Sequence, residues 1–443
     1  MTIRVAVGTG AGIVLLQLAL SAQSPVRDAR PPSAFAYIDR ATGLTVTAAV
    51  AQALEREPSL RATRSRIDAA RGIKLQAGLR PNPTLQFSQQ QEPGGTDRQT
   101  RVEVQWPLDL FRKPGRAAVA EKEIDVARNA TADRERLLAA EVRMAYGEVA
   151  AAIRALSVTD DVLAATDRQR ALVSARVEQG AAPPLERDML RVEVLRLQSD
   201  RVLQAGEVER RLVELKRLIG LSPESPLQLA DSIEQLDAAE RLNEQRQADG
   251  AAMTRRPDVR EAESRVAVAE AQIDRAEREG RADVSLFGMY MRMDAGFPQR
   301  GFNDAGALAR VRGVFHYVAG GAMVTLPLQN RNQGAVAAAQ ADRAEAALEL
   351  EATRLRADAE LAAARTREAH AREAVEPFGA DAIPLATRNL EIVRQTYELG
   401  RATLLDVLAE QRRYLEMQRA YTEVLREAYQ SRQALRQARG DTR

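Results

Sequence analysis

The chain has 443 residues, enough for two or three ordinary domains, and its net charge of +2 does not indicate a basic groove for nucleic acid. The absence of cysteine excludes disulfides and thiolate metal sites. The two histidines, His316 and His370, lie far apart in sequence, and we assign them surface or packing roles. Aromatic residues make up only 4%, whereas Ala, Leu, Arg, Glu and Gln dominate, which is typical of long helices and coiled coils.

The first residues have the pattern of an export signal. Arg4 precedes an apolar stretch at residues 5–20, and the small-residue segment ALSAQS follows. This predicts a secretory signal peptide over residues 1–22, cut near Ser21 or Ala22, with a membrane anchor as the alternative. No later segment has 18 consecutive apolar residues. An exported chain of this kind is periplasmic, secreted or a β-barrel of an outer membrane.

After an N-terminal extension at residues 23–43, the sequence predicts a helix at about 45–80, which Pro81 and Pro83 end. The segment TLQF begins a strand, EPGGTD makes a turn, and VEVQWPL at 102–108 alternates apolar and polar residues as a second strand does. A helix about 100 Å long is then expected at 111–179. A short break follows, and a returning helix is expected at 185–219.

The same plan occurs a second time. The segment PSLRATRSRIDAA at 58–70 aligns with PDVREAESRVAVA at 257–269, and the strand-end pair Pro107-Leu108 aligns with Pro327-Leu328. The chain is therefore an internal duplication, with a first repeat at 44–220, a linker at 221–250 and a second repeat at 251–443. The second repeat is 21 residues longer between its paired strands, in the Gly-rich region 294–313. Insertions belong in surface loops, so we predict a loop there.

In the second repeat, helices are expected at 252–281, 330–399 and 404–439, and strands at 284–291 and 314–328. A soluble antiparallel coiled coil would explain the helices but not the strands. Four strands are too few to close a barrel, and open edges cannot lie in lipid, so strands that cross a membrane must come from several chains. Three chains would supply twelve strands. The residues expected to face lipid are Leu85, Phe87, Val102, Val104, Trp106 and Leu108, with Gln86, Glu103 and Gln105 facing the lumen.

With these segments in place, the chain resembles the TolC-like outer membrane efflux proteins. The motifs that carry the resemblance are ALEREPSLRATRSRIDAARG, QAGLRPNPTLQF, the two strand-end Pro-Leu pairs and YELGRATLLDVLAEQRRYLE. QAGLRPNP and FRKPGRAAVAEKEIDVA are most similar to the CzcC-like metal-efflux branch. The resemblance implies a mainly α fold with a small β part. It also implies a homotrimer with a twelve-strand barrel in outer-membrane lipid, above a twelve-helix tunnel in the periplasm.

The resemblance further implies an adaptor protein and an inner-membrane pump as partners, docked at the helical tips. The tip residues would be Gly180, Pro183, Leu185, Gly400, Leu404 and Leu405. Asp406 matches an acidic position that lines the periplasmic constriction in the family. A second acidic position falls on Ala409, with Glu410 beside it, so the gate would be weaker or differently built. Helix capping is the alternative role for Asp406, and a helix C-cap for the two glycines.

The sequence contains no catalytic constellation and no phosphate-binding loop, so we expect no enzyme, no cofactor and no resident metal. We expect an outer-membrane exit duct that passively conducts a pump's cargo, with heavy-metal cations as the cargo that the branch resemblance implies. The alternatives are a duct for drug efflux or type I protein secretion, and a periplasmic coiled-coil adaptor or scaffold without a pore.

Overall fold

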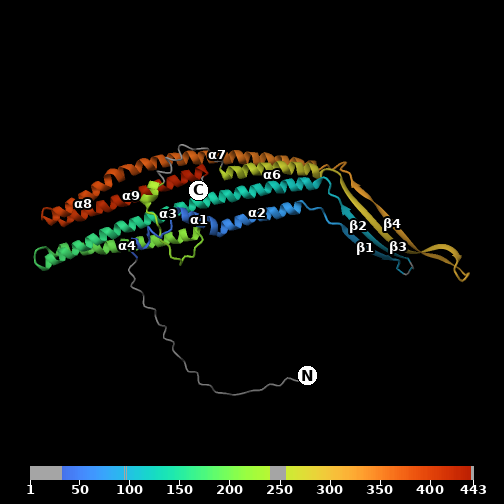
Figure 1. Cartoon of the computed structure of the whole chain (residues 1–443), viewed down its shortest axis with the longest axis horizontal. Helices are drawn as coiled ribbons and strands as arrows, with labels where there is room; N and C mark the ends of the chain where they lie inside the picture. Colours follow the sequence, from blue (N-terminus) through green and yellow to red (C-terminus); the bar gives the residue numbers. More distant parts are fainter. Residues whose placement is uncertain (1–31, 94, 96, 240–255, 441–443) are drawn as a thin grey trace, which may run out of the picture.

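The computed structural model describes residues 32–239, except 94 and 96, and residues 256–440. Figure 1 shows an elongated molecule, with a sheet at one end and helical hairpins that extend to the opposite end. The predicted signal peptide at 1–22 lies outside the described residues, as do parts of the predicted N-terminal extension and linker. In the described part of the chain, no helix combines the length and apolar composition needed to cross a membrane.

The first repeat begins with two helices where the sequence predicted one. The expected helix at 45–80 is broken at Glu57, whose φ of −61° and ψ of 122° are extended because Pro58 disfavours the helical conformation of the residue before it. The Glu57 side chain then caps the second helix by accepting from the Leu60 amide at 2.6 Å. The elements of this repeat are a 3-10 turn η1 (Ala34–Ala36), α1 (Val46–Arg56), α2 (Pro58–Ala77), β1 (Thr84–Gln91), β2 (Arg98–Pro107), α3 (Arg112–Glu178) and α4 (Pro184–Leu218).

The second repeat has the same order, with one interruption. The helix expected at 330–399 contains a π-helical segment around Gly379, and Pro384 follows at the start of the next helix. A proline lacks the amide hydrogen that an α-helical ladder requires, and a π segment accommodates that loss. The elements are α6 (Pro257–Glu279), β3 (Asp283–Phe302), β4 (Leu308–Thr325), α7 (Gln333–Pro377), η2 (Phe378–Ala382), α8 (Ile383–Glu398) and α9 (Leu404–Arg439).

The extra residues of the second repeat lengthen its strands. The prediction of a loop at 294–313 was wrong, because β3 and β4 continue to Phe302 and Leu308 and leave only a short turn. In that turn the Asn303 amide donates to the Ala307 carbonyl at 2.9 Å, and Gly306 has a φ of +73°. The glycines in this region carry no side chains, so the sequence does not show the apolar–polar alternation of a strand. The backbone pairing nevertheless continues past a bulge between Gly296 and Arg300.

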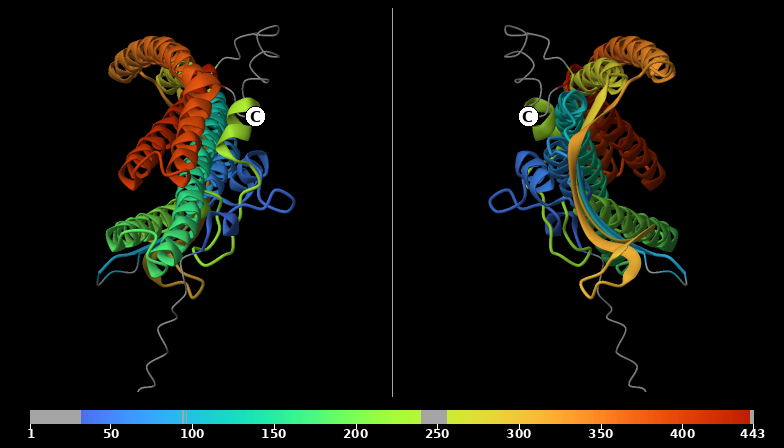
Figure 2. Two further views of the ribbon diagram at one scale, coloured as in Figure 1. Left: turned by 90° about the vertical axis from the view of Figure 1, so that its left-hand side faces the viewer. Right: turned by 90° about the vertical axis from the view of Figure 1, so that its right-hand side faces the viewer.

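The four strands form one antiparallel sheet in the order β1-β2-β3-β4. The central pairing of β2 with β3 joins the two repeats, with Val102 opposite Tyr290. The strands β1 and β4 form the two edges of the sheet. Figure 2 shows that the β3–β4 hairpin is strongly curved.

The main core lies at the middle of the helical part. It unites α1, α3, α4 and α9 with the segment after α4, and Tyr146 of α3 is fully buried in it. The Tyr146 hydroxyl donates to the Leu44 carbonyl at 2.7 Å and lies 3.1 Å from a carboxylate oxygen of Asp231. This core fixes both repeats to each other halfway between the sheet and the tips.

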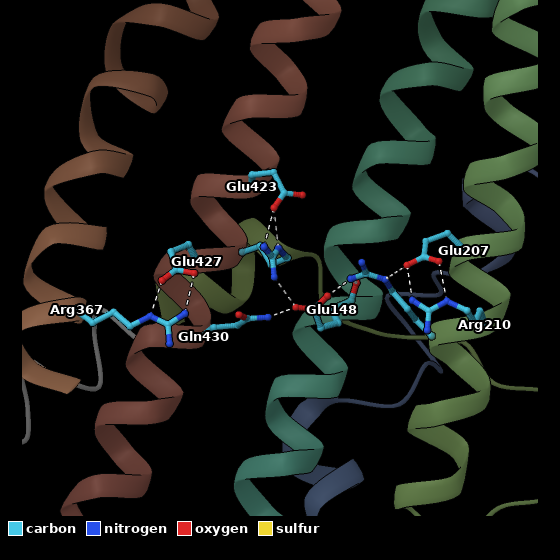
Figure 3. A network of polar contacts seen from close by, with 9 residues as sticks. Glu148, Glu207, Arg210, Arg367, Glu423, Glu427 and Gln430 are labelled. Carbon is cyan, nitrogen blue, oxygen red and sulfur yellow. Dashed lines mark hydrogen bonds and ion pairs between the residues drawn. The ribbon is translucent and has the colours of Figure 1, made fainter. Parts of the chain in front are cut away.

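A polar network crosses the same region (Figure 3). Glu148 of α3 binds Arg211 of α4 on one side and Arg426 and Gln430 of α9 on the other. Each of the three ionic side chains is about a quarter exposed. One carboxylate therefore connects a helix of the first repeat's hairpin with a helix of the second.

Candidate channel wall and helical tips

Five of the six residues predicted to face lipid come from β1 and β2 and share one face of the sheet. Leu85 lies opposite Val104, and Phe87 lies opposite Val102. Trp106 follows on the same side, and Leu108, just beyond the strand, still donates its amide to the Val284 carbonyl at 2.9 Å. This apolar face continues onto β3 and β4 through Leu286, Tyr290, Val314, Val318, Ala322 and Val324.

The opposite face, called the polar face below, includes Gln86, Glu103 and Gln105. Its β2 and β3 residues are half-buried, whereas Val104, Trp106 and their neighbours on the apolar face of the same strands are mostly exposed. The polar face is therefore the more enclosed side of the curved sheet. In a single chain, large apolar side chains such as Leu85, 71% exposed, are left on the outer side.

The two helical tips have the same geometry. Gly180 and Gly400 both have a φ of +72°, which glycine adopts without the strain that a side chain would add. Each ends a long helix through the same pair of backbone hydrogen bonds, which is the Schellman arrangement. At the first tip the Gly180 amide donates to the Val177 carbonyl, and the Ala181 amide donates to the Arg176 carbonyl. At the second tip the Gly400 amide donates to the Tyr397 carbonyl, and the Arg401 amide donates to the Thr396 carbonyl. The helix C-cap considered from the sequence is therefore a real role of both glycines.

The leucines after these turns differ in exposure. Leu185 and Leu405, equivalent positions of the two repeats, are 67% and 63% exposed. Leu404 is only 3% exposed and packs against Val173 and Leu190 of the first repeat. Leu404 therefore packs between the two tips and is not part of the tip surface. Its burial does not fit the adaptor contact predicted for it. Sequence reasoning missed Leu399, which is strongly exposed at the end of α8.

Pro183, also placed at the tip by the sequence, is exposed and occupies the N-cap position of α4. Its φ of −67° and ψ of 139° set the extended backbone from which the helix starts. It lies between Gly180 and Leu185 on the same turn.

Asp406 caps α9. Its carboxylate accepts from the Thr403 amide at 2.9 Å and from the Thr403 hydroxyl at 2.7 Å, and the Asp406 amide donates back to that hydroxyl. These hydrogen bonds lower the pKa of Asp406 below its ordinary value, so the exposed carboxylate is ionised at neutral pH. Glu410, one turn on, pairs with Arg413 at 3.1 Å. The chain thus shows the capping role, and a gate role for both carboxylates remains a prediction.

Among the described residues, no group of three or more His, Cys, Asp or Glu side chains could hold a metal ion.

Residues 49–221 match the family model described as outer membrane efflux protein. Comparison with curated protein sequences gives no match. Solved structures match over nearly the whole chain. CusC superposes with a TM-score of 0.68 at 17% identity, covering 92% of this chain and 94% of that one. The outer-membrane channel OprN gives 0.65 at 21% identity, covering 91% and 94%. The MtrE outer membrane channel of Neisseria gonorrhoeae gives 0.67 at 19% identity, covering 89% and 88%.

The fold is therefore that of an outer-membrane channel protomer, with a small sheet and long helices. Residues 49–221 are therefore similar to the outer membrane efflux protein family, and the fold of nearly the whole chain is shared with CusC and OprN. OprN and MtrE are outer-membrane channels.

Proposed function

We propose that three copies of this chain form an exit duct in the outer membrane, which conducts cargo delivered by a pump through an adaptor. The observation that carries the proposal is the sheet. It has two free edges, an apolar face and a more enclosed polar face, and it leads directly into helices that end in two matching tips. A coiled-coil scaffold would not need an apolar face on the outer side of a sheet.

Closure of the sheet requires other chains. The edge strands β1 and β4 have one unpaired side each in a single chain. Unpaired backbone groups are too costly in lipid, so a spanning sheet must close on itself. Pairing the β4 edge of one copy with the β1 edge of the next would close a twelve-strand barrel with three copies.

The helices also leave surfaces that a neighbouring copy would cover. On α8, the exposed residues Leu385, Ile392 and Leu399 recur every seven positions. On α4, Val192, Leu195 and Val202 are exposed at the spacing of a coiled-coil heptad. Exposed apolar rows of this kind mark helix–helix contacts, which supports a tunnel built from the helices of three chains.

The tips support docking to an adaptor. Leu185 and Leu405 lie at equivalent places on two turns of identical geometry, so a trimer would present six similar sites. In this proposal an inner-membrane pump supplies the energy for transport. Asp406 and Glu410 would lie near the periplasmic constriction as carboxylates that favour cations.

The cargo is a further part of the proposal. We infer heavy-metal cations, on the resemblance to the metal-efflux branch, with drugs or secreted protein as the alternatives. Deleting the gene and exposing cells to zinc, copper, cobalt and several drugs tests this. Loss of metal tolerance would support the assignment, whereas drug sensitivity with unchanged metal tolerance would reject it.

Electron microscopy of detergent-extracted protein tests the channel itself. The expected particle is hollow, threefold symmetric and about 100 Å or more in length. In planar bilayers the same preparation is expected to conduct ions. A thin, soluble rod without a lumen would instead identify a scaffold.

A further inference from the structure

Methionine is concentrated on one side of the second hairpin. The chain has nine methionines, and four of them lie in β3 and β4. Three occur in the segment MYMRM as Met289, Met291 and Met293, here named the thioether row. Because side chains alternate along a strand, all three point to the same face of the sheet.

The register shows which face this is. Met289 lies opposite Glu103, Met291 opposite Arg101 and Met293 opposite Gln99. Glu103 belongs to the polar face, so the thioether row lies on that face too. Met323 of β4, opposite Ser285, shares it. The three row residues are half-buried, whereas Tyr290 and Arg292 between them are exposed on the other side.

Apolar side chains are unexpected at these positions, because the polar face of β1 and β2 carries Gln, Ser, Thr, Arg and Glu. Methionine packing against the aromatic rings of Phe315 and Tyr317, which lie opposite Met293 and Met291, is one use for them. Leucine would fill the same space. What distinguishes methionine is the thioether sulfur, a soft donor that selects monovalent copper and its analogues over harder ions.

The spacing allows more than one sulfur to reach one ion. Alternate residues on a strand are about 6.6 Å apart, and each methionine side chain has three rotatable bonds. The Gln99 amide already donates to the Met291 sulfur, so this thioether is turned toward its polar neighbours. The charged side chains beside the row on this face are Glu103, which favours a cation, and Arg101, which opposes one.

We propose that the thioether row is a binding site for soft monovalent cations, Cu(I) or Ag(I), on the lumen wall of the duct. The site deepens the proposed function, on which it rests, by naming the class of metal cargo. Three copies of the row would ring the lumen at one height in the trimer. Thioether ligands are neutral, so they select a soft ion without the strong attraction of an anionic ligand. Such binding suits a duct, because the ion must dissociate again to leave.

The test is isothermal titration of the purified full-length trimer in detergent with silver nitrate in chloride-free buffer. Silver is used because it is a soft monovalent ion that needs no reductant. The test variant is M289L/M291L/M293L, which keeps the apolar volume. The control variant, M144L/M189L/M417L, changes the same number of methionines in the helices.

Wild type and control variant are expected to bind silver alike, and the test variant about tenfold or more weakly. Zinc nitrate is expected to give no competition. Equal silver affinity in all three proteins, or none in the wild type, would overturn the site. Bilayer conductance is measured on the same samples: conduction without silver binding refutes only the site, whereas silver binding without conduction refutes the duct.

Discussion

A β-carbon on Gly147 would lie 2.4 Å from the Tyr429 ring, so α3 and α9 touch where only glycine fits. Tyr429 is 1% exposed and belongs to the core that joins the repeats. Gly147→Ala is expected to destabilise the protein by about 1–3 kcal/mol, because the rigid ring has to shift. Thermal unfolding of the detergent-solubilised protein measures this.

The matched control is Gly72→Ala on α2, where an added β-carbon meets nothing within 4 Å. It is expected to stabilise by about 0.5–1 kcal/mol, because alanine loses less backbone entropy in a helix. If Gly147→Ala behaved like Gly72→Ala, the close approach of α3 and α9 would be refuted.

The Glu148 network gives a second prediction. Glu148→Ala removes the carboxylate shared by Arg211 and Arg426 and is expected to cost about 1–2 kcal/mol, since the group is hydrogen-bonded yet partly exposed. Urea unfolding is the measurement. Asp167→Ala, which removes an exposed ion pair with Arg170 on the same helix, is expected to cost less than about 0.5 kcal/mol. Equal effects would mean that Glu148 makes only an ordinary surface contact.

The third prediction concerns acid stability. Hydrogen bonds from Arg210, and then from Arg211, lower the pKa of Glu207 from its ordinary 4.5 to about 2. Because the folded-state pKa is depressed, this stabilisation is complete above pH 4.5 and is lost as the pH falls to about 2. Its size is small, because the Glu207 side chain is 38% exposed.

The melting temperature of Glu207→Gln is therefore expected to lie below that of the wild type at pH 7, with a difference that shrinks between pH 4.5 and 2. A difference that stayed constant over this range would show that the ionised carboxylate is not the cause.

Much of the fold was predictable from local chemistry. The alternation at Val102, Val104 and Trp106 and the duplicated prolines and glycines predicted the strands, the long helix α3 and the turns. The sequence did not reveal the full length of β3, because glycine carries no apolar period while its backbone still pairs. The sequence also did not show that Leu404 is buried whereas Leu405 is exposed. Burial between α3, α4 and α9 depends on how the tips pack together.

The two tip leucines give a fourth prediction. The double substitution Leu185→Glu/Leu405→Glu changes two exposed side chains, so thermal unfolding is expected to stay unchanged. If these residues contact the adaptor, the substitution is expected to abolish the tolerance of cells to the exported compound. Leu404→Ala is the matched variant, expected to destabilise the tip by about 2–5 kcal/mol because its side chain is buried. Normal tolerance in the exposed double variant would exclude these leucines from the docking surface.

The last prediction separates the two roles of Asp406. A charge at the constriction acts on passing ions, whereas a cap acts on the start of α9. Asp406→Asn removes the charge, and Thr403→Ala removes the hydroxyl of the capping box while leaving the carboxylate in place. If three ionised carboxylates line the constriction, Asp406→Asn is expected to reduce the preference for cations in planar-bilayer reversal potentials, and Thr403→Ala is expected to leave it unchanged. An equal loss of cation preference in both variants would assign Asp406 to capping alone. Both substitutions weaken the start of α9, but only Asp406→Asn alters the charge that faces the ions.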